Sequence, residues 1–228
     1  MRRAILTGGL VLALSALAGC TPQAALVSSL LPDGTVSTLL SHLEREEDGN
    51  RRKVVELEGR RDWDGLAKFA EEHLAKDRHN ADWWFVAGYA HTQAGRHSRA
   101  VESYDELLRL APDDMLVWNL LAQSYRAAGR PQRAVQTLNN ALRLRQEAPE
   151  SWFLLGESYS DLSRHDQAAA AYRGAVKLQP GFAQAWVGLG QAQARLGRLA
   201  DFNETVRTLE KLDPKAAAEL AKQRPAAR

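Results

Sequence analysis

The sequence predicts an all-α fold built from stacked helical hairpins, and three observations support this prediction. Four tryptophans, Trp84, Trp118, Trp152 and Trp186, recur at a constant interval of 34 residues. Glycine or serine recurs between them, and proline closes three of the four blocks that they define. Residues that favour helix dominate, whereas alternating runs of valine, isoleucine and threonine bounded by turns are nearly absent.

The first twenty residues have the form of an export signal. Two arginines precede an apolar run at residues 4–18, which is shorter than the ~20 residues that a membrane-spanning helix needs. The run ends in Leu17-Ala18-Gly19-Cys20. These four residues resemble the lipobox of bacterial lipoproteins, which implies cleavage after residue 19 and a diacylglyceryl group on the Cys20 sulfur. We therefore expect a signal peptide at 1–19 and a lipid anchor at Cys20; the alternative is an ordinary signal peptide with a chance cysteine.

Cys20 is the only cysteine, so no disulfide can form within the chain even in an oxidising compartment. Thr21 follows it, where an aspartate would be the known signal for retention in the inner membrane. We therefore expect a lipid-anchored protein on the periplasmic face of the outer membrane, with the inner membrane as the alternative.

The mature chain is expected to be electrically neutral. The full chain has 30 Lys+Arg and 28 Asp+Glu, and removal of the two arginines of the signal peptide leaves 28 of each. Because binding of phosphates requires a basic surface, this balance argues against nucleic acid as a partner.

Residues 20–46 differ from the rest of the chain and are expected to form a lipid-anchored segment with short helices at 24–31 and 35–46, separated by the turn Pro32-Asp33-Gly34. These helices either cap the first repeat or bind a partner or the membrane. At the other end, residues 215–228 are expected to form a polar capping helix and a tail.

The repeat becomes clear when the chain is divided into blocks 81–114, 115–148, 149–182 and 183–214. Positions 4, 7, 8 and 11 of each block share one face of a first helix, and positions 17, 20, 24 and 27 share one face of a second. Small residues at positions 8 and 20 allow the helices to approach closely, and large residues at positions 4 and 24 fill the space around this contact. Position 15, which is Gly95, Gly129, Ser163 and Gly197, forms the turn between them.

Two features depart from a regular repeat. Position 11 is His91 in the first block and Gln193 in the last. A degenerate block is expected at 47–80, where the same register places Trp63, Leu66 and Ala70 on the face of a second helix, preceded by a polar first helix near residues 51–58. Terminal repeats are often irregular because one face meets solvent.

The third block shows the full pattern most clearly. It carries Trp152, Leu155, Gly156, Tyr159, Ala168, Tyr172, Ala175 and Pro180. This pattern resembles the tetratricopeptide repeat. The resemblance implies a right-handed α-solenoid whose first helices line a concave groove that binds a protein or peptide.

In such arrays the residues at positions 2, 5, 9 and 12 face the groove. The resemblance therefore implies a peptide-binding groove formed by Phe85, Tyr89, Asn119, Gln123, Arg126, Phe153 and Glu157. Aromatic rings would supply contact area, and amides would bind an extended peptide backbone. The alternative is that Phe85, Tyr89 and Phe153 pack between repeats. No lysine or arginine stands at position 5 or 9, so binding of an acidic C-terminal tail is not expected.

No motif indicates catalysis. The sequence contains no His-Glu-x-x-His, no phosphate-binding glycine loop and no Gly-x-Ser-x-Gly elbow. We expect no enzymatic activity, no catalytic residue, no metal, no cofactor and no small-molecule substrate. The predicted function is a membrane-anchored periplasmic scaffold for protein–protein interaction, serving as an adaptor in the assembly of an envelope machine such as a pilus or secretin. The alternative is a regulatory scaffold that recruits cell-wall hydrolases or proteases.

Overall fold

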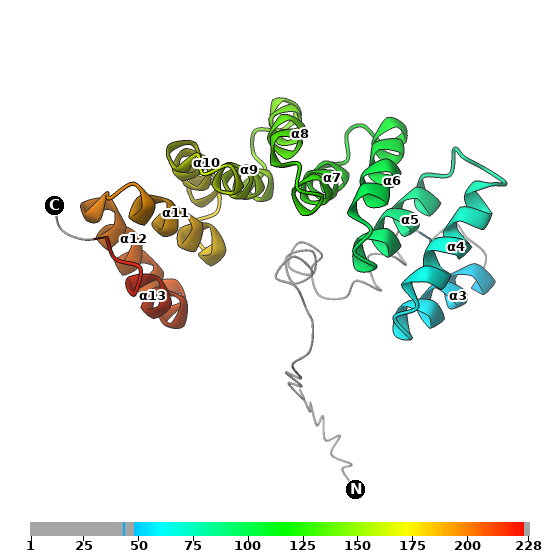
Figure 1. The fold of residues 1–228 in the computed structure, drawn as a ribbon, viewed down its shortest axis with the longest axis horizontal. Helices are drawn as coiled ribbons and strands as arrows, with labels where there is room; N and C mark the ends of the chain where they lie inside the picture. The colour runs from blue at the N-terminus through cyan, green and yellow to red at the C-terminus, as the bar shows by residue number, and fades with distance from the viewer. Residues whose placement is uncertain (1–42, 44–47, 226–228) are drawn as a thin grey trace, which may run out of the picture.

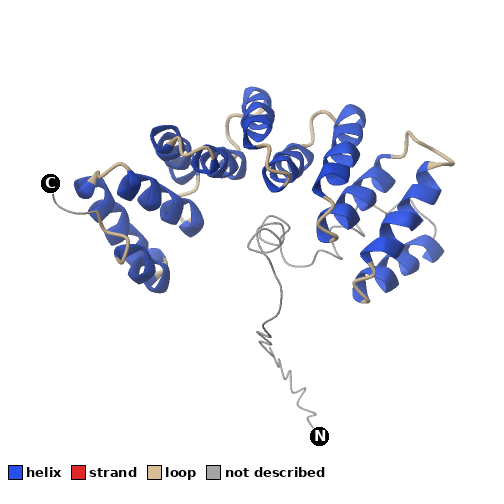
Figure 2. Ribbon diagram, viewed as in Figure 1, coloured by secondary structure: helices blue, strands red, loops and turns tan. Residues whose placement is uncertain are grey.

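The computed structural model describes residue 43 and residues 48–225. Between residues 48 and 225 the chain forms α-helices joined by short turns, and this part contains no strand (Figure 2). The helices are α3 (Asp48–Gly59), α4 (Trp63–Leu74), α5 (Ala81–Gln93), α6 (His97–Leu110), α7 (Met115–Ala127), α8 (Pro131–Leu144), α9 (Pro149–Asp161), α10 (His165–Leu178), α11 (Ala183–Arg195), α12 (Leu199–Leu212) and α13 (Pro214–Ala221). The all-α prediction is confirmed.

The helices are paired and stacked into an open arc (Figure 1). Each helix packs on the next along the chain, and the first helices α7, α9 and α11 also contact one another in sequence. In Figure 1, α7 lies on the inner side of the arc and α8 on the outer side. The helices α5, α7, α9 and α11 begin at Ala81, Met115, Pro149 and Ala183, which are the first residues of the four blocks. The fold is an α-solenoid, as expected.

The turn inside each hairpin has a left-handed residue at position 15. Gly95, Gly129 and Gly197 have φ values of 71°, 72° and 69°, and Ser163 has a φ of 56° in the equivalent turn. Arg61, 34 residues before Gly95, has a φ of 54° in the turn between α3 and α4. The backbone of the α3–α4 hairpin therefore follows the same period, although Arg61 and Ser163 have a Cβ atom in a region that favours glycine.

Close packing inside the hairpins depends on glycine opposite tyrosine. A Cβ atom on Gly88 would lie 2.5 Å from Cε1 of Tyr104, and one on Gly156 would lie 2.6 Å from Cδ1 of Tyr172. Gly188, from the next repeat, touches the same Tyr172 ring, because its Cβ would lie 2.5 Å from Cε1. The small residue at position 8 thus makes room for the large residue at position 24, as the sequence indicates.

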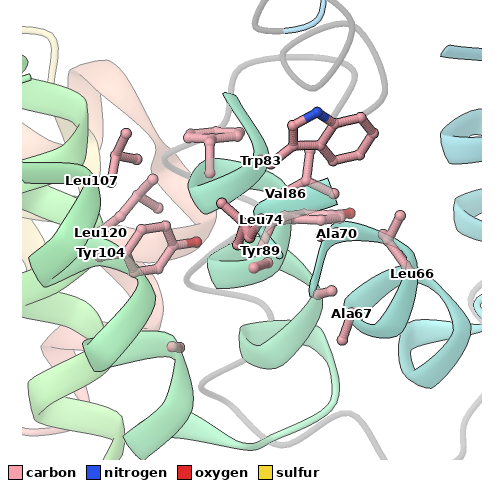
Figure 3. Packing of buried hydrophobic residues seen from close by; sticks show 14 of the residues in the cluster. Leu66, Ala67, Ala70, Leu74, Trp83, Val86, Tyr89, Tyr104, Leu107 and Leu120 are labelled. Carbon is pink, nitrogen blue, oxygen red and sulfur yellow. The ribbon is translucent and has the colours of Figure 1, made fainter. Parts of the chain in front are cut away.

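The hydrophobic core lies between the packed helices and continues from one repeat to the next. Figure 3 shows its N-terminal part, where Leu66 of α4, Trp83 of α5 and Tyr104 of α6 are buried together. Leu43 belongs to the same cluster and is completely buried. The predicted signal peptide, Cys20 and the predicted helix at 24–31 lie outside the described residues, as does the helix at 35–46 apart from Leu43.

The repeated tryptophans at position 4 are only half-buried, so they fill the space around the helix contact less completely than three of the four residues at position 24. Each indole lies over the turn that precedes its helix and donates a hydrogen bond from Nε1 to a backbone carbonyl six residues earlier. The pairs are Trp84 to Arg78 (2.8 Å), Trp118 to Pro112 (2.8 Å), Trp152 to Gln146 (2.9 Å) and Trp186 to Pro180 (2.8 Å). The tryptophan column therefore ties each repeat to the turn before it, because an indole N–H that is partly removed from water needs an acceptor.

The C-terminal end of the array is closed by α13. Asp213 caps this helix by accepting a 2.9 Å hydrogen bond from the backbone N–H of Ala216. Leu220 of α13 is buried in one cluster with Phe202 of α12. The apolar side of the last repeat is thereby covered, as an array requires at its ends.

Candidate functional site

Three aromatic residues that the resemblance places in the groove are buried. Phe85, Tyr89 and Phe153 have exposed fractions of 1%, 3% and 6%. The ring of Tyr89 lies edge-on to Trp63 of the preceding hairpin, with centroids 5.9 Å apart. The ring of Phe153 lies 5.0 Å from Phe182, which precedes the next repeat. These rings have the packing role that the sequence left open as the alternative, and they are not exposed anchors.

The other four predicted groove residues are polar and lie on the first helices α7 and α9. Asn119 and Gln123 are as buried as Phe153, at 7% and 6%, whereas the Arg126 and Glu157 side chains are 12% and 23% exposed. Asn119, Gln123 and Arg126 are spaced by four and three residues and so share one face of α7. Arg126 donates to Glu157 of α9, from Nη2 to Oε2 over 3.1 Å. The structure therefore brings the Arg126 and Glu157 side chains into direct contact.

Arg126 has a second partner that the repeat pattern did not indicate. Its Nε donates to Oδ2 of Asp161 over 2.7 Å. Asp161 follows Glu157 by one helical turn, so helical spacing was the signal that could have found it. With 12% of its side chain exposed, Arg126 is held between two carboxylates, and the group carries one negative charge in total.

The carboxylate of Glu157 also joins this group to the core. Its Oε1 accepts a 2.5 Å hydrogen bond from the hydroxyl of Tyr172, and that hydroxyl lies 3.2 Å from Oγ of Ser160. Burial, reinforced by the negative charge of Glu157, raises the pKa of Tyr172 above its usual value. The tyrosine therefore stays protonated and remains a donor, which fixes the position of Glu157.

Gln123 is the unusual residue of this surface. Only 6% of it is exposed, yet neither its Nε2 nor its Oε1 has a hydrogen-bond partner within the described part of the chain. Its neighbour Asn119 does have one, because Oγ of Ser151 donates to Asn119 Oδ1 over 2.7 Å. A buried polar group without a partner costs ~1–3 kcal/mol. Buried polar groups nearly always have a hydrogen-bond partner, so this amide is a place where a bound molecule can supply one.

We call Asn119, Gln123, Arg126, Glu157 and Asp161 the polar surface of α7 and α9. Residues 48–225 contain no group of three or more histidine, cysteine or acidic side chains placed to hold a metal ion. Within the same range no helix has the length and apolar character needed to cross a bilayer. The side chains of the polar surface are two amides, two carboxylates and one guanidinium, which interact through hydrogen bonds and charge.

Comparison with known proteins agrees with this geometry. Models of the tetratricopeptide repeat match residues 81–124, 119–181 and 153–217. A TPR repeat-containing protein of Methanocaldococcus jannaschii, MJ1428, is 30% identical over 101 residues, which is 42% of this chain but 18% of that relative. The chain thus spans less than a fifth of the curated relative that it matches.

Solved structures show the same fold. The MamA protein superimposes with a TM-score of 0.65 at 20% identity, over 79% of this chain and 94% of that one. YrrB, described as a TPR protein with an unusual peptide-binding site, has a TM-score of 0.62 at 16% identity, over 82% and 98% of the two chains. TTC0263 of Thermus thermophilus has a TM-score of 0.56 at 18% identity, over 77% and 97%. The repeat models together cover more than half of the chain, which therefore belongs to the tetratricopeptide repeat family.

Proposed function

We propose that this protein is a lipid-anchored periplasmic scaffold that binds another protein through the polar surface of α7 and α9. We further propose that it acts as an adaptor in the assembly of an envelope machine such as a pilus or secretin. The observation that supports binding at this surface is the amide of Gln123, which is removed from water without a hydrogen-bond partner among the described residues.

An extended polypeptide segment can supply the hydrogen-bond partners that the Gln123 amide lacks among the described residues. A side-chain amide donates through Nε2 and accepts through Oε1, and a backbone offers a carbonyl and an N–H that match both atoms. Because Gln123 is 6% exposed, a change of its rotamer has to precede the contact. Side-chain rearrangements of this size are common when protein partners meet.

The charge of the surface limits the partner. Arg126 is neutralised by Glu157 and Asp161, and one negative charge remains. An acidic segment would meet repulsion here, since no free cation of the polar surface can receive it. The partner segment is therefore neutral or basic, in agreement with the absence of lysine and arginine at positions 5 and 9.

The proposed anchor depends on Leu17-Ala18-Gly19-Cys20. A single acyl chain binds membranes only marginally, at roughly 0.8 kcal/mol per buried CH₂, so two or three chains are needed for a stable anchor. We expect Cys20→Ser to move the protein from the membrane fraction to the soluble periplasmic fraction. If the variant stayed in the membrane fraction, acylation of Cys20 would not be the anchor.

Binding can be tested by photo-crosslinking in intact cells. Asp161 is 39% exposed at the edge of the polar surface and is a better site for a benzoylphenylalanine probe than the buried Tyr89. A probe at Gln136, exposed on α8, serves as the control. We expect one discrete adduct from position 161 and none from position 136. Pilus or secretin components in that adduct would support the adaptor role. A cell-wall hydrolase or protease in the adduct would refute the adaptor role and support the regulatory scaffold.

Gln123→Leu separates binding from folding. The leucine keeps a similar volume and removes the unsatisfied amide, so we expect the free energy of unfolding to rise while the adduct from position 161 is lost. If the adduct persisted at full yield in this variant, Gln123 would have no part in binding.

A further inference from the structure

A second candidate site lies on the opposite side of the first helices. A cavity of about 590 Å³ opens between the second helices α4 and α6 and has α5 as its floor. Trp84, Ala87 and His91 of α5 form the floor, and Glu71 of α4 stands in the wall. We call this cavity the His91 pocket.

Two side chains of α5 in the His91 pocket are smaller than their equivalents in the middle repeats, and they extend the pocket along α5. The hollow at the equivalent place in the third block, about 630 Å³ beside Trp152, does not reach positions 7 and 11. Position 7 is Ala87 here and leucine in the other three blocks, and position 11 is His91 here but Tyr125 and Tyr159 in the two middle blocks. Positions 7 and 11 are one helical turn apart on the same face, so both changes enlarge the same space. Gln193 at position 11 of the last block lines an equivalent, smaller cavity of about 370 Å³.

The middle repeats show which side chains stand at the equivalent positions. Tyr125 occupies position 11 on α7, and its hydroxyl donates to Oδ2 of Asp105 on α6 over 3.2 Å. Asp105 is position 25 of its block, and the equivalent residue of the preceding block is Glu71. The pocket thus retains the carboxylate acceptor of this pair, while histidine replaces the tyrosine that would donate to it.

In the His91 pocket the carboxylate of Glu71 makes only loose contacts with two basic side chains. Its Oε1 lies 3.6 Å from Nε2 of His91 and 3.6 Å from Nη1 of Arg99, both longer than a hydrogen bond. Half of the Glu71 side chain is exposed. A hydroxyl donor entering the pocket can therefore reach this carboxylate without first breaking a strong ion pair.

The walls are acidic. Four carboxylates and two guanidiniums line the pocket, namely Glu71, Glu102, Asp105 and Glu106 against Arg78 and Arg99. Arg109 pairs with Glu106 from outside the pocket, at 2.5 Å between Nη1 and Oε2, so one negative charge remains. Burial, followed by the charge of Arg96, lowers the pKa of His91 below 6.5, so this ring adds no positive charge at neutral pH. Basic residues in a partner are favoured beside the pocket.

We propose that the His91 pocket binds the side chain of a tyrosine from a partner protein, in a segment that carries basic residues. The phenol ring lies beside the His91 ring, which itself stands where Tyr125 stands one repeat later, and it packs against Trp84 and Ala87. Its hydroxyl donates to Glu71. This site is separate from the polar surface of α7 and α9, so either can fail without the other.

The probe for this site is p-cresol, which is the tyrosine side chain itself, added to the full-length chain labelled with ¹⁵N. The reporter is the indole N–H resonance of Trp84, which lines the pocket. We expect p-cresol to shift this resonance in a saturable manner and to bind about tenfold more tightly than toluene, which lacks the hydroxyl. No shift, or equal affinities for the two compounds, would overturn the proposal.

Two variants test the residues involved. His91→Tyr places in the pocket the residue used by the middle repeats and is expected to abolish p-cresol binding, whereas Gln193→Tyr, at the same repeat position near the other end, is expected to leave it unchanged. Glu71→Gln is expected to lower p-cresol affinity by about tenfold and to leave toluene affinity unchanged. If p-cresol bound to His91→Tyr as tightly as to the natural chain, its binding site would lie outside the His91 pocket and the proposal would be refuted.

The charge of the partner is tested with blocked tripeptides. We expect tyrosine between two lysines to bind more tightly than tyrosine between two glutamates, with a difference that shrinks as salt is added. Equal affinities at low salt would refute the basic character of the partner segment.

Discussion

Replacing Gly156 by alanine tests the packing on which the repeats depend. The new Cβ would lie 2.6 Å from Cδ1 and from Cε1 of Tyr172, whereas carbon atoms in contact are ~3.5–4.0 Å apart. The ring cannot easily retreat. It is buried, Gly188 touches it from the next repeat, and its hydroxyl is bound to Glu157.

Two opposing effects decide the magnitude. Alanine is favoured over glycine inside a helix by roughly 1 kcal/mol. Overpacking of a well-filled core costs about 1–3 kcal/mol. An overlap of this size with a ring that is held on two sides belongs at the upper end of that range. We therefore expect Gly156→Ala to lower the free energy of unfolding by ~1–2 kcal/mol, which corresponds to roughly 3–6 °C in Tm for a chain of this length.

The chain contains its own compensating pair. In the preceding repeat the equivalent positions are Ala122 and Leu138, both completely buried. The double variant Gly156→Ala with Tyr172→Leu reproduces this pair. We expect it to be more stable than the sum of the two single changes predicts, by ~1–2 kcal/mol, because residues in direct contact couple. Urea and thermal unfolding followed by circular dichroism measure all four proteins.

Gly49→Ala in α3 is the matched control, because nothing lies within 4 Å of the new Cβ there. We expect this variant to be as stable as the natural chain or slightly more stable. The reasoning would be refuted if Gly156→Ala were no less stable than the natural chain, or if the single and double changes at positions 156 and 172 were additive.

Three further predictions follow from the turns, the tryptophans and the buried histidine. Ser163→Gly is expected to raise the free energy of unfolding by ~0.5–1 kcal/mol, because the left-handed φ of 56° favours glycine. Trp152→Phe keeps a ring but loses the hydrogen bond to the carbonyl of Gln146, at an expected cost of about 1 kcal/mol. His91 has a lowered pKa in the native state, so the unfolded state binds its proton first and stability is expected to fall as pH drops through 6.5. His91→Gln, which places at position 11 the residue of the last repeat, is expected to reduce this loss.

Each of these predictions has a clear contrary result. For the turn, the reverse change Gly129→Ser is the control, and a Ser163→Gly variant less stable than the natural chain would show that the backbone angle is not strained. For the tryptophan, unchanged urea unfolding of Trp152→Phe would mean that the indole hydrogen bond contributes nothing. For the histidine, identical stability profiles of the natural chain and His91→Gln between pH 5 and pH 8 would exclude His91 as the titrating group.

The sequence by itself determined the period, the hairpins and their turns. These features are local, since a left-handed residue at Gly95 or Ser163 and a small residue opposite Tyr172 express constraints within one hairpin. The same register places Arg61 at position 15 of the degenerate block, and its φ is left-handed as at the other turns although the residue is not glycine. The lipid anchor at Cys20 stays a prediction, because that residue lies outside the described part of the chain.

Only the tertiary structure decided which faces are covered. Position along a helix gives the direction of a side chain but not how closely the neighbouring helices approach it, and the stacking of successive hairpins sets that distance. Phe85 and Phe153 therefore became interior residues, although the resemblance placed them in a groove. Stacking also left Gln123 without a partner among the described residues and opened the space beside His91, because several helices together make each of these surroundings.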